Sequence, residues 1–533
     1  MNNNIKKKLG QMMVFGFNAD HPSKVSDEMK EMIEKHHVGG VILFGRNIGT
    51  PKDILTLTNK LQRIARDAGH EHPLFITIDQ ENGVVRRLGE GTTVFPGAML
   101  LGATQEPKNA YKTGRLTAKE LKALGINWNL APVVDVNNNP LNQVIGVRSF
   151  GEDAKTVAQF SEQAMKGMQD AEVMTTIKHF PGHGDTDLDS HLELPTIKHT
   201  MERLENVELI PFKQCIENGA DVVMTSHVYF PALEPREGVP ATLSRSVLTG
   251  LLRDKLDFRG LITTDCMEMK AIADTIGTAN GAVEAMKAGV DLIMISLSYD
   301  LQVNALRKIE HSFKNGEIGL GQIEASYERV MLAKEKYLSW DDLQLDRDIV
   351  KVPEIVGCNQ HKKEADEIFQ QGVTVVENKG ETLPLGTSSE QKTLVIYPEN
   401  GYLTMAEDKR YSSHALGQVI QENDENAKTA VIGDDEESID ALIKQAEQYD
   451  TLIIGTISAA NSSHQQNVVK RLKMLNKTMV IVAMRSPYDI NYLPEVDAYV
   501  TAYEFTTPAL RFAAKAIYGK IDVNGRSPVT LKV

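Results

Sequence analysis

The chain has 533 residues, of which 41% are hydrophobic and 24% are charged, and its formal net charge is −14. This composition is typical of a soluble globular protein, and the length predicts about two to four domains. The acidic balance disfavours a surface for nucleic acid or anionic membrane, because phosphate binding depends on clustered Lys and Arg. We therefore expect a small-molecule partner, no nucleic acid and no membrane.

Targeting and disulfide signals are missing from the sequence. The N-terminal stretch MNNNIKKKLGQMMVFGF is basic, but its apolar run is short and lacks a small-residue cleavage site, so no signal peptide is expected. No apolar run reaches the length of about 18 residues that a membrane span needs. The cysteines Cys215, Cys266 and Cys358 are far apart and odd in number, which argues against a disulfide framework. These features predict a cytoplasmic protein.

The first two thirds of the chain alternate short apolar runs with longer helical patterns. The runs with strand character are QMMVFGF, VGGVILFG, LFITID, NLAPVVDV, VMTTIKHF, ADVVMTSH, GLITTD and DLIMIS. A helix that returns the chain for a parallel strand is predicted by the spacing of Val157, Phe160, Ala164, Met165 and Met168. Eight strands alternating with helices predict a TIM-type (β/α)8 barrel, although an open doubly wound sheet also fits this periodicity.

A second α/β series follows the charged, irregular stretch KYLSWDDLQLDRDIVKVPEIVG. Its apolar runs are TLVIY, TAVIG, TLIIGT, TMVIVA and DAYVTAY, and helical stretches separate them. This pattern predicts a smaller α/β sandwich. We therefore expect a barrel domain over residues 1–340, a linker over 341–360 and a C-terminal α/β sandwich domain over 361–533.

Polar side chains follow the apolar part of many runs in the first domain. They are Asp79, Asp135, Lys178 with His179, Ser226 with His227, and Asp265. In a barrel the carboxyl ends of the strands share one rim, where active sites are built. The sequence therefore predicts a single site at this rim.

The segment KHFPGHGDTDLDSH, residues 178–191, could bind a metal. A calcium loop is excluded, because Ser190 stands where an EF-hand needs Gly and Thr196 where it needs a bidentate Glu. The zinc ligands would be His179, His183 and His191. Zinc is disfavoured, because no HExxH helix is present and glycine-rich loops hold ligands poorly. We predict no metal and no cofactor.

The same segment fits acid/base chemistry better. Asp189 stands two residues before His191, where it can orient the imidazole ring and stabilise its protonated form. Gly182 and Gly184 would let such a loop move and carry His191 in and out of a site. The triplet alone also fits a solvated turn.

Three further signals each have a structural alternative. Asp265 ends a buried strand, so it either caps a helix within the rim or faces a substrate. Asp79 and Arg87 in DQENGVVRRL could hold a polyol, and a structural salt bridge explains them equally well. Arg148 in IGVRSFGED could bind substrate or be an ordinary surface arginine.

In combination and order, DQENGVVRR, IGVRSFG, KHFPGHGDTDLDSH, TSHV and TTDCMEM resemble glycoside hydrolase family 3, specifically its β-N-acetylglucosaminidase branch. The resemblance covers almost the entire chain, since GVTVVENKGETLPL and the region from SPYDI to NGRSPVTL are similar to the family's second domain. One departure is Asn82-Gly83, where the family usually has two glycines. It could alter the turn before Arg87.

This resemblance implies a retaining glycosidase in which Asp265 is the nucleophile and His191 the acid/base, with Asp189 as its partner. The residues that hold the sugar hydroxyls would be Asp79, Arg87, Arg148, Lys178 and His179, with His227 nearby. Both catalytic roles usually fall to carboxyl groups, so histidine is an exception. Its reference pKa of about 6.5 suits proton donation near neutral pH.

The implied function is a cytoplasmic exo-β-N-acetylglucosaminidase that removes terminal GlcNAc from cell-wall muropeptide fragments. One alternative is an N-acetylglucosaminide phosphorylase, because a histidine base leaves the pocket without a second carboxylate to repel phosphate. Another is a non-catalytic sugar-binding protein, against which the intact Asp265, Asp189 and His191 argue. If His191 is not the acid/base, Glu268 is the nearest candidate. Since every assigned residue precedes the linker, the second domain is expected to serve stability more than chemistry.

Overall fold

The computed structural model describes residues 3–186, 194–343, 345, 351–387, 391–399, 403–404, 406–410 and 412–532. Eight parallel strands form one sheet in the order β7-β6-β5-β4-β3-β2-β1-β8. They are β1 (Met13–Phe15), β2 (Gly40–Leu43), β3 (Phe75–Ile78), β4 (Trp128–Asn129), β5 (Met174–Phe180), β6 (Val222–Thr225), β7 (Leu261–Thr263) and β8 (Ile293–Ile295).

Backbone hydrogen bonds join the two end strands of this sheet. The Leu292 N–H donates to the Ile262 carbonyl and the Thr264 N–H donates to the Leu292 carbonyl, both at 3.0 Å. The sheet therefore closes into a TIM-type barrel, which confirms the prediction and excludes the open doubly wound alternative.

Helices surround the barrel. They are α1 (Asn3–Gln11), α2 (Asp27–His36), α3 (Pro51–Asp67), α4 (Ala98–Ala103), α5 (Pro107–Ala123), α6 (Ala154–Gln169), α7 (Met201–Asn206), α8 (Leu209–Glu217), α9 (Lys270–Ala273), α10 (Thr278–Ala288), α11 (Tyr299–Lys314) and α12 (Leu320–Tyr337). The apolar residues that predicted α6 are all buried on it. Among the described residues, none of the helices combines the length and the apolar character needed to cross a membrane.

Side chains along the barrel strands alternate between two cores, as the two-residue period of a strand requires. Val14 and Phe75 belong to a cluster shared by all eight strands, whereas Phe15 and Ile76 pack in the layer that includes the surrounding helices. Both faces of the sheet are thus apolar, which explains why the strands read as continuous apolar runs in the sequence.

The second domain contains a six-stranded sheet in the order β11-β10-β12-β13-β14-β9. Its strands are β9 (Thr374–Asn378), β10 (Thr393–Pro398), β11 (Lys428–Ile432), β12 (Thr451–Thr456), β13 (Thr478–Ala483) and β14 (Ala498–Thr501), and its helices are α13 (Asn359–Gly372), α14 (Ala415–Gln421), α15 (Glu436–Ala446), α16 (Ser463–Lys473) and α17 (Thr507–Ile517). The five predicted runs form β10 to β14. The antiparallel edge strand β9 was not predicted.

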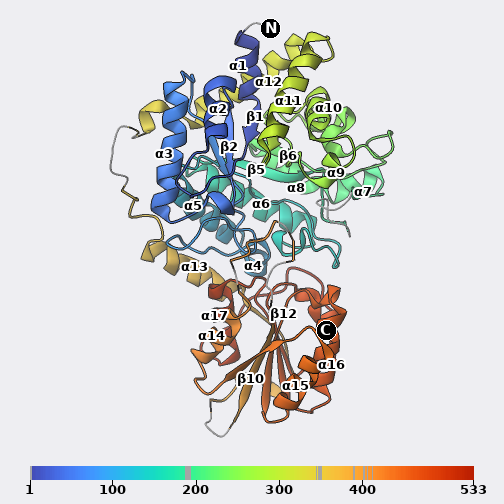
Figure 1. Cartoon of the computed structure of the whole chain (residues 1–533). Helices are drawn as coiled ribbons and strands as arrows, with labels where there is room; N and C mark the ends of the chain where they lie inside the picture. The colour runs from blue at the N-terminus through green and yellow to red at the C-terminus, as the bar shows by residue number, and fades with distance from the viewer. Residues whose placement is uncertain are drawn as a thin grey trace.

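The two domains share an apolar core. Figure 1 shows the second domain at the end of the barrel opposite α1 and α12. Phe95 and Leu100 of the barrel domain pack in one cluster with Phe369 on α13 and Phe512 on α17, and the last two rings stack at 6.4 Å. This shared core holds the second domain against the loops that follow the barrel strands.

One carboxyl group in this interface should make stability depend on pH. Glu504 is 1% exposed, and burial raises its pKa to about 7. The unfolded chain loses this proton near pH 4.5 and the folded chain only near pH 7, so Glu504 should lower the free energy of unfolding as pH rises between these values, by up to about 3 kcal/mol. We expect Glu504→Gln to remove this loss. The difference between the denaturation midpoint of Glu504→Gln and that of the parent protein should therefore increase as pH rises from 4.5 to 7.

The matched control is Glu422→Gln, which changes a partly exposed carboxyl group paired with Arg511. Its midpoint relative to the parent should stay nearly constant over the same range. A Glu504→Gln midpoint that runs parallel to that of the parent would contradict the prediction.

Candidate active site

A cavity of about 540 Å³ lies at the carboxyl end of the barrel strands. The predicted site residues that line it are Asp79, Arg87, Arg148, Lys178, His179 and Asp265. They lie at or beyond the ends of four different strands. The closed barrel therefore brings together residues that are far apart in the sequence.

Two carboxylates and two cations form a buried network in the wall of this cavity. Lys178 Nζ lies 2.7 Å from both Asp79 Oδ1 and Glu81 Oε1. Arg148 donates to the Glu81 carboxylate through Nε at 2.8 Å and Nη2 at 2.7 Å. Burial alone would raise the pKa of Glu81, but Arg148 and Lys178 outweigh it and hold that pKa well below its usual range. Glu81, Arg148 and Lys178 therefore stay charged at neutral pH.

This network differs from the salt bridge that the sequence offered as an alternative. Asp79 pairs with Lys178, and no described residue makes a hydrogen bond or ion pair with the Arg87 guanidinium, which lines the cavity. Glu81, the partner of Arg148, was missed by the sequence analysis. Its signal was the second carboxylate of the DQE triplet, which follows β3.

Asn82 stands where the family usually has glycine, and it adopts a left-handed φ of 71°. Asn tolerates this conformation better than most residues. Its Nδ2 donates to Thr117 Oγ1 at 3.0 Å, and its Oδ1 accepts from Gln80 Nε2 at 3.1 Å. Gln80 Oε1 in turn accepts the N–H groups of Arg87 at 2.9 Å and Leu88 at 3.1 Å. Asn82 thus keeps the turn and helps to orient the backbone that carries Arg87.

We expect Asn82→Gly to raise KM about three- to tenfold with a smaller change in kcat. Glycine keeps the turn but loses both side-chain hydrogen bonds of Asn82, one with Gln80 and one with Thr117, and such bonds each contribute about 1 kcal/mol. Steady-state kinetics with an aryl glycoside measures both constants. Thr117→Val, which removes one of the two bonds, should have a smaller effect, and an unchanged KM in Asn82→Gly would rule out this role for Asn82.

Asp135 organises the start of the loop after β5. Its carboxylate accepts the N–H of His183 at 2.7 Å and that of His179 at 3.2 Å, and it lies 2.8 Å from His179 Nδ1. Burial lowers the pKa of His183 to about 4, so this ring is neutral at neutral pH. Its Nδ1 lies 2.9 Å from Thr186 Oγ1. Asp135 therefore fixes the backbone of two histidines from below the cavity surface.

Asp265 follows β7 and is partly exposed, and its Oδ1 accepts the N–H of Cys266 at 2.7 Å. His227 does not line the cavity. It is 1% exposed, its Nδ1 lies 2.8 Å from Thr242 Oγ1, and its Nε2 lies 3.0 Å from the Cys266 carbonyl oxygen. The structure therefore places His227 behind the backbone that carries Asp265.

Glu268, the alternative acid/base, does not line the cavity. Its Oε2 accepts the N–H groups of Ser296 and Leu297, both at 2.7 Å, and its Oε1 accepts that of Ser298 at 2.9 Å. This carboxylate anchors the loop after β8.

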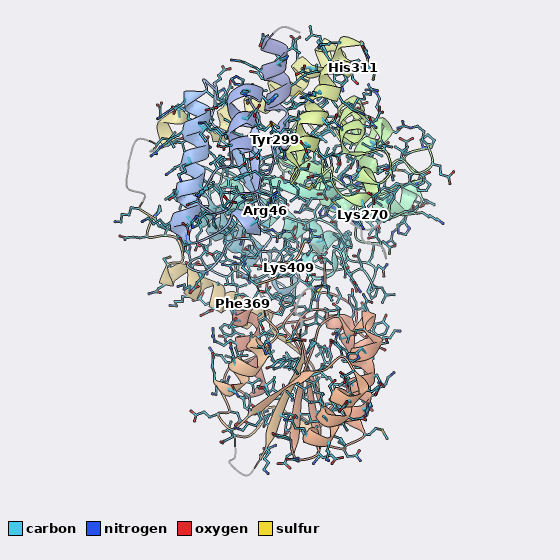
Figure 2. All side chains as sticks on the ribbon, viewed as in Figure 1. Arg46, Lys270, Tyr299, His311, Phe369 and Lys409 are labelled. Carbon is cyan, nitrogen blue, oxygen red and sulfur yellow. The ribbon has the colours of Figure 1, made fainter. Side chains whose placement is uncertain are left out.

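The second domain also contributes to the cavity. The lining residues that it supplies are Ala406, Glu407, Asp408, Lys409 and Arg410. Arg410 Nη2 donates to the Arg87 carbonyl at 2.7 Å, and the Asp408 N–H donates to the Val84 carbonyl at 2.9 Å. Figure 2 shows Lys409 where the two domains meet. The sequence analysis placed the whole site before residue 340, because nothing in the sequence relates this loop to the barrel.

The predicted acid/base pair, Asp189 and His191, lies outside the described residues. Before it, Gly182 has φ 135°, and a Cβ on Gly184 would lie 1.7 Å from the Val136 carbonyl oxygen. These two glycines are thus required by conformation and by close packing, a reason that differs from the loop motion inferred from the sequence. Within the described ranges, no group of three or more His, Cys, Asp or Glu side chains is arranged to bind a metal.

Comparisons with known proteins identify the family. The Glycosyl hydrolase family 3 N terminal domain matches residues 4–333, and the Glycosyl hydrolase family 3 C-terminal domain matches residues 373–533. Beta-hexosaminidase A of Pseudoalteromonas piscicida is 30% identical over 95% of this chain and 91% of its own length.

Two solved structures resemble the whole chain. A glycoside hydrolase family 3 β-N-acetylglucosaminidase from Paenibacillus sp. str. FPU-7 is 37% identical, with a TM-score of 0.91 over 98% of each chain. A fungal multi-domain β-N-acetylglucosaminidase of the same family is 37% identical with a TM-score of 0.92, and the match covers 99% of this chain and 60% of that one. Because both domains match, the chain belongs to glycoside hydrolase family 3 and is a glycoside hydrolase.

Proposed function

We propose that the chain is a retaining exo-β-N-acetylglucosaminidase that releases terminal β-linked GlcNAc. The observation that carries this proposal is the position of Asp265, which lies partly exposed in a cavity of about 540 Å³ whose wall holds the charged network of Asp79, Glu81, Lys178 and Arg148. The names of the relatives, β-hexosaminidase and β-N-acetylglucosaminidase, support the choice of sugar.

In the proposed mechanism the Asp265 carboxylate attacks the anomeric carbon as the glycosidic C–O bond breaks. His191 protonates the departing oxygen, and a covalent glycosyl-enzyme forms. His191 then takes a proton from water, which attacks the anomeric carbon and releases Asp265. Asp189 orients the His191 ring and stabilises its protonated form. Two inversions restore the β configuration of the sugar.

The charged network would hold the terminal sugar through its hydroxyl groups. Carboxylates accept hydrogen bonds from hydroxyls, whereas Lys and Arg donate to them. Because Asp79 holds Lys178, and Glu81 holds both Lys178 and Arg148, little side-chain entropy is lost when the sugar binds. Arg87, whose guanidinium makes no hydrogen bond to another described residue, would provide a further donor, and His179 lies beside this network in the cavity wall.

For the physiological role we propose cell-wall muropeptide fragments as substrate and the cytoplasm as the place of action. Both follow from the family resemblance of the sequence motifs.

The test compares aryl β-GlcNAc with aryl β-glucoside, each with and without phosphate. We expect faster release from aryl β-GlcNAc, no dependence on phosphate, and free β-GlcNAc as the first product seen by NMR. A rate that depends on phosphate, together with a sugar 1-phosphate product, would show that the enzyme is a phosphorylase and not a hydrolase. No turnover of either glycoside, with GlcNAc still bound, would favour a sugar-binding protein.

A further inference from the structure

Arg485 of the second domain joins three separate segments of the chain. It follows β13, its side chain is 2% exposed, and its guanidinium reaches three acceptors. Nη1 donates to Ser458 Oγ at 2.9 Å, while Nη2 donates to Glu407 Oε1 at 2.6 Å and to the Gln143 carbonyl at 2.9 Å. The last of these bonds crosses from the second domain to the barrel loop after β4.

Two of these acceptors belong to segments that form the cavity wall. Glu407 lines the cavity, and its second oxygen, Oε2, accepts the N–H of Leu403 at 3.1 Å. Gln143 precedes Val144, which lines the cavity and whose carbonyl accepts from Arg148 Nη1 at 2.9 Å. Arg485 therefore binds the residue next to Val144, and the Val144 carbonyl directly supports the Arg148 guanidinium.

The same barrel loop also supports the segment that leads to the predicted acid/base pair. Asn142 Nδ2 donates to the carbonyls of His183 at 3.0 Å and Gly184 at 2.9 Å. Asn142 Oδ1 accepts the N–H groups of Val144 at 2.9 Å and Ile145 at 2.8 Å. A displacement of Gln143 would thus move Arg148 and the backbone at His183 together.

Burial makes a purely stabilising role a poor explanation of this ion pair. The side chains of Arg485 and Glu407 are 2% and 0% exposed, so forming the pair requires two charges to be taken out of water. Well-packed apolar residues at such positions are often as stable or more stable. A planar guanidinium does offer directional donors that a single ammonium or an apolar side chain cannot replace.

We propose that Arg485 is a positioning residue through which the second domain sets the geometry of the catalytic cavity. Arg485 holds the cavity-lining segment that contains Glu407 against residues 142–148 and so fixes the position of the Arg148 side chain. This inference rests on the proposed function, because it concerns the same cavity. It also gives the second domain a role in substrate binding that the barrel alone does not supply.

The experiment compares Arg485→Lys, Arg485→Gln and the double variant Arg485→Gln/Glu407→Gln in the full chain. Lysine keeps the charge beside Glu407, and the double variant leaves no unpaired buried carboxylate, so at least one of these proteins should fold. Aryl β-GlcNAc hydrolysis gives kcat and KM, GlcNAc inhibition gives Ki, and thermal unfolding gives Tm. Gln371→Ala is the matched control, because it removes a bond to Asn109 on α5 from residues that do not line the cavity.

We expect Arg485→Gln to raise KM and the Ki of GlcNAc at least about tenfold, with a smaller change in kcat, and Arg485→Lys to fall between it and the parent. If Arg485→Gln does not fold, the double variant should show the same rise. Gln371→Ala should stay within twofold of the parent. A lower Tm with KM and Ki within twofold in the folded variants would overturn the inference while the parent remains active. A parent without activity on aryl β-GlcNAc would overturn the proposed function and this inference with it.

Discussion

Asp265→Ala should leave a folded protein whose activity is lower by at least about a thousandfold. The substitution removes the proposed nucleophile, and without it the covalent route is closed. The fold should tolerate the change, because Asp265 is partly exposed and its Oδ1 accepts the N–H of the neighbouring residue Cys266. Turnover of aryl β-GlcNAc and thermal unfolding measure the two effects separately.

A matched control and a chemical label sharpen this test. Asp274→Ala changes an exposed aspartate at the end of α9 and should leave kcat and KM unchanged. A fluorinated GlcNAc analogue that keeps the 2-acetamido group should accumulate the glycosyl-enzyme, and peptide mapping should find the label on Asp265. More than about a tenth of the parent activity in Asp265→Ala, or a label on another residue, would remove Asp265 from this role.

His191→Ala should damage turnover of a natural disaccharide far more than formation of the glycosyl-enzyme from an aryl glycoside. An acidic aryl leaving group departs with little protonation, whereas a sugar alkoxide must be protonated as it leaves. The second step still needs a base to activate water, so the variant should show a burst of aryl release followed by a slow steady state. Stopped-flow absorbance measures both phases. Azide needs no base and should accelerate the slow phase, giving a β-glycosyl azide.

Asp189→Ala should show a milder form of the same pattern, because the imidazole remains but is no longer held in its tautomer. If His191→Ala lowers the turnover of both substrates equally and azide has no effect, His191 only positions the sugar. The search would then move away from Glu268, whose carboxylate is bound by three backbone N–H groups. Asp408, which lines the cavity from the second domain, would be tested next.

The architecture was predictable because parallel strands that are covered on both faces appear in the sequence as continuous apolar runs. Runs such as VMTTIKHF and ADVVMTSH became β5 and β6, and the helical spacing before the first of them became α6. The antiparallel edge strand β9 was missed, although it has the same length as β11, the opposite edge strand, which was predicted.

Four candidate site residues were predictable because polar residues that end buried strands must meet at one rim of a barrel. These residues, Asp79, Lys178, His179 and Asp265, all line the cavity. Arg87 and Arg148, which the family resemblance supplied, line it as well. His227 has the same sequence signature but lies behind the backbone of Asp265 and Cys266. A strand-end position thus predicts closeness to the rim, whereas the direction of the side chain depends on its local packing.

The sequence by itself determined the two α/β domains, the family resemblance and the residue types available for catalysis, because these depend on local periodicity and on motifs within short segments. The tertiary structure alone decided which charges pair. Glu81 forms an ion pair with Arg148, and Asp79 forms one with Lys178. Arg485 donates a hydrogen bond across the domain interface to the Gln143 carbonyl. These partners are distant in the chain, and their pairing depends on how barrel closure and domain packing place them within about 3 Å of one another, which is information that no local pattern contains.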